Sequence, residues 1–231
     1  MNPWLSIIIP SYNEEAQIRP LLEKLTQICE SVPHEILVSD AGSIDATASQ
    51  VNLTSAQYLK APVKGRAAQM NHASQRAKGE WLFFLHADCQ PPINFIEDLK
   101  DVVERGYDAA CFRLEFKTTN LFLKANAWFT RFNVNAFRFG DQGLLVSRSF
   151  FEKAGGYNPE HIVLEDQDFV TRLRKMGAKF RVMPNYMLTS ARKYKENGPL
   201  RLQLIFLIIW IKYRLGYSQP ALVQFYKSRM Q

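Results

Sequence analysis

The chain has 231 residues, 47% of them hydrophobic, which is enough to bury the core of one large α/β domain with a small appendage and excludes a disordered chain. Its three cysteines are an odd number without CxxC spacing, so neither a disulfide framework nor a structural zinc site is expected, and a reducing cytosol fits. The net charge of +7 is uneven, because residues 170–231 carry 13 Lys and Arg against one acid, Glu196, while residues 1–169 carry an excess of acids.

Apolar runs alternate with helical periodicities in the first half of the chain. Buried strands are predicted at 5–10, 35–39 and 81–86, with a weaker strand at 56–59. Helices are predicted from about Glu14, after the loop 40–47, over 66–77 and over 93–105. This alternation indicates βαβ units, and the continuous apolar strands indicate a sheet that is covered on both faces. We therefore expect a Rossmann-like α/β fold with a mostly parallel sheet.

The second half of the chain is more mixed. Strands are predicted at 109–116, 143–147 and 180–183, and the aromatic-rich segment 122–139 is left unassigned. Helices are predicted over 168–176, from Pro199 to about 215, and from about Gln219. We divide the chain into an α/β domain, 1–190, and an appendage of basic, amphipathic helices, 191–231.

Polar side chains follow three of the predicted strands. Asn13 and Glu14 follow the first, Asp40 follows the second, and Asp88 follows the apolar run 81–86. Each alone is explained by capping of the next helix. Together they predict a shared crevice, because ligands of open parallel sheets bind beyond the carboxyl ends of the strands.

Clustered acids require a cation or hydrogen-bond donors. Asp88 suits a hard divalent cation such as Mg²⁺, which completes its shell with phosphate oxygens and water. Asp40 suits a base N–H or a ribose hydroxyl. Lys64 and Arg66, at a glycine-led helix start, predict a phosphate cradle.

Five stretches carry a resemblance: "SIIIPSYNEE", "EILVSDAGSIDAT", "GRAAQMN", "FLHADCQPP" and "VLEDQDF". In this order and at these distances they resemble the inverting family 2 glycosyltransferases of GT-A fold, over residues 4–183. "GRAAQMN", "LHAD" and "SAR" are similar to a bacterial subgroup, the radical-SAM and selenodomain-associated "transferase 2" proteins, some of them linked to arsenosugar biosynthesis.

The resemblance implies roles for individual residues. Those of the nucleotide pocket are Pro10, Asn13, Glu14, Asp40, Gly42, Ser43, Arg66 and Arg192. Asp88 would take the last position of the family's DxD motif and bind Mn²⁺ or Mg²⁺ with the diphosphate. His86 stands where the first Asp of that motif is expected, so two alternatives stay open: a metal site with imidazole nearby, or weaker metal binding with basic groups in its place.

"LEDQDF" supplies candidates for the base that inversion needs. The match to the family's ED pair implies Asp166 as the base with Glu165 in support, although acids in a first helical turn also complement the helix dipole. Asp141, Gln142 and Gly143 resemble the family's acceptor-side loop.

The segment 201–217 is apolar around most of its circumference and flanked by Lys and Arg. It fits the core of a helical appendage, a homodimer contact or a helix resting on an anionic membrane. No signal peptide and no membrane span are expected, since the apolar run 204–211 is far shorter than the roughly 20 residues of a span. We expect a cytoplasmic protein, with peripheral contact at the inner face of the membrane as one option.

The resemblance implies transfer of a sugar from a nucleoside-diphosphate sugar, UDP-linked by preference, to a hydroxyl acceptor that could be lipid-linked. Two alternatives stay open: a nucleotide-sugar binding protein without catalysis, and a sugar-phosphate nucleotidyltransferase. A sugar-phosphate nucleotidyltransferase would carry a glycine-rich loop after the first strand, whereas this chain has "PSYNEE" there. Nucleic acid is not an expected partner, because the aromatic residues are mostly at core spacing.

Overall fold

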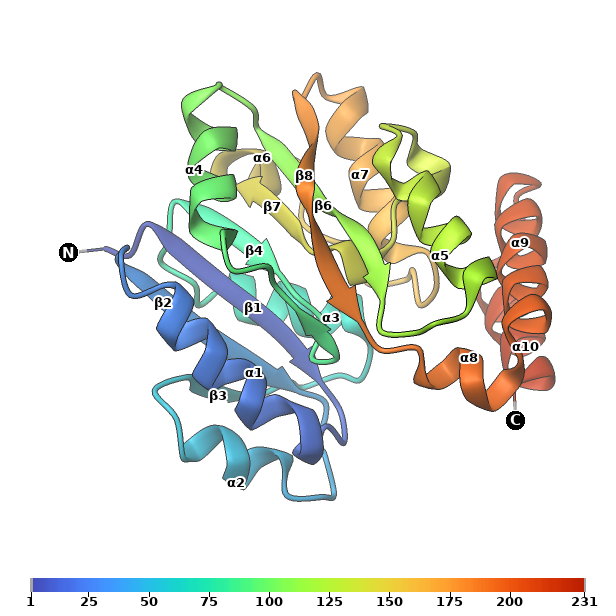
Figure 1. The fold of residues 1–231 in the computed structure, drawn as a ribbon, viewed down its shortest axis with the longest axis horizontal. Helices are drawn as coiled ribbons and strands as arrows, with labels where there is room; N and C mark the ends of the chain where they lie inside the picture. The colour runs from blue at the N-terminus through green and yellow to red at the C-terminus, as the bar shows by residue number, and fades with distance from the viewer. Residues whose placement is uncertain (1, 231) are drawn as a thin grey trace.

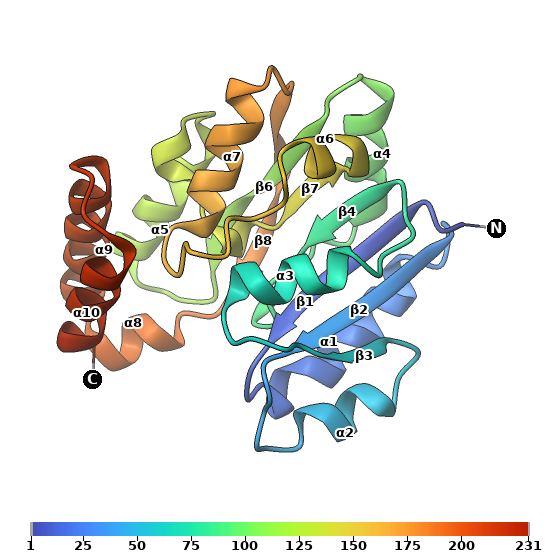
Figure 2. The same cartoon turned by 180° about the vertical axis from the view of Figure 1, so that it is seen from behind.

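The computed structural model describes residues 2–230, which form one eight-stranded sheet with helices packed on both faces (Figure 1, Figure 2). The strands are β1 (Leu5–Ser11), β2 (His34–Asp40), β3 (Gln57–Lys60), β4 (Trp81–Phe84), β5 (Cys89–Gln90), β6 (Ala109–Phe116), β7 (Leu144–Ser147) and β8 (Phe180–Thr189). Their order in the sheet is β3-β2-β1-β4-β7-β6-β8-β5. The expected α/β fold with a mostly parallel sheet is confirmed.

The direction of the strands brings many loops to one edge of the sheet. β1, β2, β3 and β4 pair in parallel, and β6 pairs in parallel with β8. β7 lies between these two groups and is antiparallel to both β4 and β6. The loop that enters β7 therefore lies at the same edge as the loops that leave β1, β2, β4 and β8.

The helices cover the sheet and continue beyond it. They are α1 (Glu15–Ile28), α2 (Thr47–Asn52), α3 (Arg66–Ser74), α4 (Phe95–Glu104), α5 (Leu121–Trp128), α6 (Arg148–Lys153), α7 (Glu165–Lys175), α8 (Arg192–Asn197), α9 (Pro199–Arg214) and α10 (Gln219–Arg229). Short 3-10 turns are η1 (Phe129–Arg131), η2 (Asn135–Phe137) and η3 (Gly140–Gln142).

Alternate residues of the strands enter two separate cores. Ile7 and Ile9 of β1 point to the face that α1 and α4 cover, whereas Ile8 points to the face that α3, α6 and α7 cover (Figure 1, Figure 2). All three side chains are fully buried. This two-sided burial explains why the strands are continuous apolar runs rather than alternating ones.

β8 is longer than the predicted strand 180–183. The sequence pattern stops at Pro184, because proline cannot donate a ladder hydrogen bond and is a poor residue for a strand interior. In the structure the register shifts there: Cys111 pairs with Val182, but Arg113 pairs with Tyr186. A bulge in β8 thus accommodates the proline, and the strand continues to Thr189.

α9 and α10 pack against each other beside α5 and α8, away from the sheet (Figure 1). Leu202, Ile205 and Ile209 of α9 and Leu222 of α10 are buried in this arrangement. The predicted helical appendage is present. Among residues 2–230, none of the helices combines the length and the apolar character that crossing a bilayer requires.

Candidate active site

Arg66 lies at the centre of a group of acidic side chains. It is the first residue of α3, and its Nη1 is 3.6 Å from Oε1 of Glu165 at the start of α7. Partial burial opposes its charge, but the carboxylates of Glu165, Asp141, Asp166 and Asp88 outweigh this and raise the pKa of Arg66. The predicted base, metal ligand and acceptor-side loop therefore converge on one cation.

His86 is paired with Asp141, which sits in η3 immediately before β7. Nδ1 of His86 is 2.8 Å from Oδ1 of Asp141, and the histidine is only 6% exposed. Burial and Arg66 oppose protonation of the imidazole, yet the hydrogen bond and charge of Asp141 outweigh them and raise the pKa of His86. Burial also acts on Asp141, but His86 holds the pKa of that carboxyl well below its usual range. The hydrogen bond between the two side chains thus acts on the pKa of each in opposite directions.

Gly140 lies between His86 and the predicted base. A Cβ placed on this glycine would lie 2.6 Å from Nε2 of His86 and closer still to Oδ2 of Asp166. Nε2 of His86 is buried and has no hydrogen-bond partner among the described residues. The glycine thus lets the imidazole and the Asp166 carboxylate approach the same point. Residues 141–143 of this loop are among the predicted site residues but Gly140 is not, because its only signal in the sequence is the glycine itself.

Asp166 has the electrostatics of a general base. Burial and the neighbouring Glu165 raise the pKa of Asp166 to about 7, against the opposing charges of His86 and Arg66. Tyr157, which the sequence analysis did not name, is fully buried next to this pair. Burial raises the pKa of Tyr157 well above its usual value, and Asp166 and Glu165 add to this effect. A carboxyl poised near neutral pH can accept a proton from a hydroxyl group.

Four side chains offer ligand atoms that all lie within 4.8 Å of one another: His86, Asp88, Cys89 and Asp141. Burial and the two aspartates raise the pKa of the Cys89 thiol well above its usual value, so it stays protonated and is a poor ligand. Two carboxylates beside an imidazole fit a divalent cation such as Mn²⁺, whereas Mg²⁺ would depend on the carboxylates alone. The residues present therefore fit the expected metal.

Asp40 organises the loop that follows β2. It is fully buried and accepts hydrogen bonds from the backbone N–H of Gly42 at 3.0 Å, from that of Ser43 at 2.8 Å and from the Tyr58 hydroxyl at 3.0 Å. Ser43 in turn accepts a hydrogen bond from the backbone N–H of Asn13 at 2.8 Å. A base N–H could reach Asp40 only by exchanging one of these bonds, so its observed role is to shape the loop.

Glu14 and Arg192 connect this loop to the acidic group. Burial, and after it the charge of Asp88, raises the pKa of Glu14, while Arg192, Lys193 and Arg66 act the other way. Glu14 therefore lies within electrostatic reach of both the metal-site acid and the start of α8. Pro10 is buried within β1, one residue before its end.

Gln142 and Gly143 pack into the core rather than toward the acidic group. Nε2 of Gln142 donates to the Phe112 carbonyl at 2.8 Å, and its Oε1 accepts from the Phe139 N–H at 2.9 Å. Gly143 packs so closely on Phe83 that a Cβ would lie 2.5 Å from the ring. Their packing favours a structural role over the expected contact with an acceptor, and only Asp141 of this trio faces the acidic group.

Solved structures share this fold along nearly the whole chain. A mannosyltransferase from Pyrobaculum calidifontis, in complex with GDP-Man and Mn²⁺, superposes with a TM-score of 0.71 at 18% identity and covers 97% of this chain and 69% of its own. Glucosyl-3-phosphoglycerate synthase from Mycobacterium tuberculosis, with Mn²⁺, UDP and phosphoglyceric acid, gives 0.66 at 17% identity, with coverages of 94% and 80%.

Similar sequences carry glycosyltransferase names. An uncharacterized glycosyltransferase of Haemophilus influenzae is 27% identical over 180 residues, which are 73% of this chain and 61% of the relative. An undecaprenyl-phosphate 4-deoxy-4-formamido-L-arabinose transferase of Serratia proteamaculans is 30% identical over 113 residues, 45% of this chain and 35% of the relative. The chain thus spans less than two thirds of the length of both. The family model "Glycosyl transferase family 2" matches residues 6–162, well over half of the chain. The protein therefore belongs to glycosyltransferase family 2.

Proposed function

We propose that this protein transfers a glycosyl group, with inversion, from a nucleoside-diphosphate sugar to a hydroxyl acceptor, and that Asp166 is the general base. The observation that carries the proposal is the clustering of Asp166, Asp141 and Asp88 around Arg66, where burial and Glu165 raise the pKa of Asp166 to about 7. A carboxyl near neutral pH is ionised in part yet basic enough to take a proton. A UDP-linked sugar is the first donor to test, because UDP and GDP-Man are bound in the structural neighbours.

In the proposed reaction Asp166 removes the proton from the acceptor hydroxyl. The acceptor oxygen forms a bond to the anomeric carbon on the face opposite the diphosphate, and the bond from that carbon to the diphosphate oxygen breaks. Positive charge develops on the sugar in between, as in glycoside hydrolysis. The leaving diphosphate takes the bonding electrons, and Arg66 and Arg192 offset its charge.

Asp88 and Asp141, with the His86 imidazole beside them, would hold the divalent cation. When bound, such an ion supplies charge neutralisation for the diphosphate. His86 already neutralises part of the charge of Asp141 without a metal. We infer that the metal contributes less here than in a site with two bare aspartates.

Asp166→Asn tests the base. The asparagine keeps the size of the side chain but cannot accept a proton, so turnover should fall by about 10³-fold while the donor dissociation constant stays within about threefold. Isothermal titration with the nucleotide sugar gives the affinity, and release of nucleoside diphosphate gives turnover. Unchanged turnover would move the base elsewhere. Donor binding without any turnover in the unaltered protein would favour the binding-protein alternative, and release of pyrophosphate would favour a nucleotidyltransferase.

A second apolar face of α9 supports a membrane-associated acceptor. Five exposed residues are spaced by three or four positions and so share one side of the helix: Leu200, Leu204, Leu207, Ile211 and Leu215. This side lies opposite the buried residues of α9, and the same pair of helices carries the exposed cations Arg201, Arg214, Lys227 and Arg229. We propose that this face, within the appendage 191–231, rests on an anionic membrane, where a lipid-linked acceptor would be presented.

Vesicle flotation tests the membrane contact. The protein should float with vesicles that contain phosphatidylglycerol and less with pure phosphatidylcholine, and Leu204→Glu with Leu207→Glu should abolish the difference. Ile93→Glu is the control, because Ile93 is even more exposed than Leu204 and Leu207 but lies before α4. If light scattering shows a dimer for the unaltered protein and a monomer for the double variant, this face instead contacts a second copy of the chain.

Membership of the radical-SAM and selenodomain-associated subgroup also remains a proposal, supported by "GRAAQMN", "LHAD" and "SAR".

A further inference from the structure

The turn that delivers the proposed base has an unusual backbone conformation. Leu164, the residue before α7, has φ 61° and ψ 23°, in the left-handed region that is unfavourable for a leucine. No side chain caps the helix at this position. Because Glu165 and Asp166 follow directly, any relaxation of Leu164 would redirect both carboxylates. Such a conformation persists only where the surrounding structure determines it.

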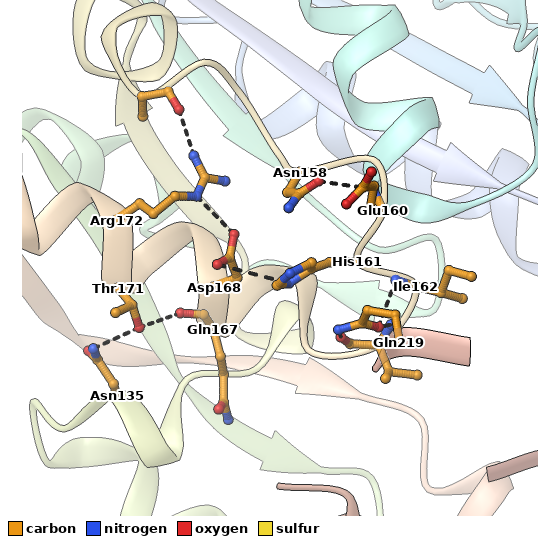
Figure 3. A network of polar contacts seen from close by, with 12 residues as sticks. Asn135, Asn158, Glu160, His161, Ile162, Gln167, Asp168, Thr171, Arg172 and Gln219 are labelled. Atoms are coloured by element: carbon orange, nitrogen blue, oxygen red, sulfur yellow. Dashed lines mark hydrogen bonds and ion pairs between the residues drawn. The ribbon is translucent and has the colours of Figure 1, made fainter. Parts of the chain in front are cut away.

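Gln219, the first residue of α10, binds the two residues before this turn (Figure 3). Its Oε1 accepts hydrogen bonds from the backbone N–H of Ile162 at 3.1 Å and of Val163 at 3.2 Å. Its Nε2 donates to the Val163 carbonyl at 3.3 Å. One side chain, 55 positions further along the chain, therefore pairs with three backbone groups just ahead of Leu164.

A second contact links the same segment to the C-terminal helices. The ring of His161 packs edge-on against Tyr213 of α9, with centroids 5.8 Å apart. On its other side His161 lies 3.9 Å from Asp168, which Arg172 holds at 2.8 Å (Figure 3). Residues 161–164 thus lie between α9 and α10 on one side and α7 on the other.

We infer that Gln219 is a positioning residue for the proposed base: by fixing Ile162 and Val163 it holds Leu164 in the left-handed conformation and sets the direction in which Asp166 leaves the turn. This inference rests on the proposed function of Asp166. It gives the C-terminal helical pair a part in the reaction that is separate from membrane contact, because Gln219 faces the α/β domain rather than the exposed face of α9.

Gln219→Ala removes all three hydrogen bonds, whereas Gln219→Glu keeps the two that Oε1 accepts. We expect turnover to fall by about 10- to 100-fold in the alanine variant and by an intermediate factor in the glutamate variant, because small displacements of a reacting group are costly. Donor affinity should stay within about threefold for both, since Gln219 does not touch the predicted nucleotide residues. The matched control is Gln17→Ala, an exposed glutamine of α1 on the opposite face of the sheet from α7.

Hydrogen–deuterium exchange provides a readout that does not depend on activity. The amides of Ile162 and Val163 should exchange faster in Gln219→Ala than in the unaltered protein, and at the unaltered rate in Gln17→Ala. Slow exchange together with unaltered turnover in Gln219→Ala would overturn the inference. Should that variant fail to fold, Gln219→Glu with unaltered turnover and exchange would overturn it equally. Asp166→Asn, measured in parallel, separates the two proposals. If Asp166→Asn retains turnover, Asp166 is not the base. If Asp166→Asn loses turnover while Gln219→Ala stays fully active, only the positioning role of Gln219 is refuted.

Discussion

Gly140→Ala probes the approach of His86 and Asp166 to the same point. The added Cβ would lie 2.6 Å from Nε2 of His86 and nearer to Oδ2 of Asp166, whereas ordinary contacts begin at 3.4 Å. Both side chains must therefore retreat by about 1 Å, a displacement that can cost about 10²-fold in rate when it affects a reacting group. Gly140 is not among the glycines with positive φ, so the alanine introduces no left-handed backbone strain. The fold should survive because only side-chain ends are displaced.

The assay compares kcat for release of nucleoside diphosphate with the melting temperature of each variant. Gly177→Ala is the control, because Gly177 has φ 84° and open space around it at the end of α7. That control should lose about 1 kcal/mol of stability through backbone strain and keep its kcat. Gly140→Ala should show the opposite pattern, a large loss of kcat in a folded protein. A folded Gly140→Ala enzyme with kcat within threefold of the original would refute the arrangement of His86, Gly140 and Asp166.

Three further outcomes follow from the site and the core. Since Asp166 must be ionised to act and its pKa is raised to about 7, kcat/KM should rise about tenfold per pH unit below 7 and level off above it; a flat profile from pH 5.5 to 8 would contradict this. Asp88→Ala should remove the Mn²⁺-dependent part of donor binding in titration calorimetry, and unaltered heats would exclude Asp88 as a ligand. Arg138 is only 2% exposed and donates hydrogen bonds to the carbonyls of Thr130 and Phe132. Arg138→Ala should therefore lower the free energy of unfolding, measured in urea, by about 3 kcal/mol. The control Lys117→Ala, at an exposed position, should lower it by less than about 0.5 kcal/mol.

The sequence predicts well what local patterns determine. Continuous apolar runs such as 5–10 and 81–86 identify the buried strands, because residues on both faces of a covered sheet are apolar. The site edge is predictable for the same reason, since the carboxyl ends of β1, β2 and β4 meet there. β7 is antiparallel to β4 and therefore begins at this edge. For this reason Asp141, which precedes β7, lies near residues that follow the parallel strands.

What the sequence does not predict depends on tertiary packing. Gly140, Tyr157 and Gln219 carry no motif, and each matters only through a neighbour that is distant in sequence. Gln142 shows the converse case. A polar residue in a family-like loop reads as an acceptor contact, but its amide binds the backbone of β6 and of Phe139 inside the core. Hydrogen bonding of buried backbone groups is a sufficient reason for a buried glutamine.

His86 stands where the resemblance to the family's DxD motif places an aspartate, and this alters the charge balance around Arg66. Glu14, Asp88, Asp141, Glu165 and Asp166 crowd around Arg66, and a further acid at position 86 would stand against Asp141 at hydrogen-bond distance. The hydrogen bond and charge of His86 lower the pKa of Asp141 against the effect of burial, whereas burial, and after it Glu165, raises the pKa of Asp166 despite the charges of His86 and Arg66. Two neighbouring carboxylates thereby have pKa values shifted in opposite directions, to about 2 for Asp141 and to about 7 for Asp166. At neutral pH Asp141 is an anion that can face a cation and Asp166 can exchange a proton, which is the combination that the proposed reaction uses.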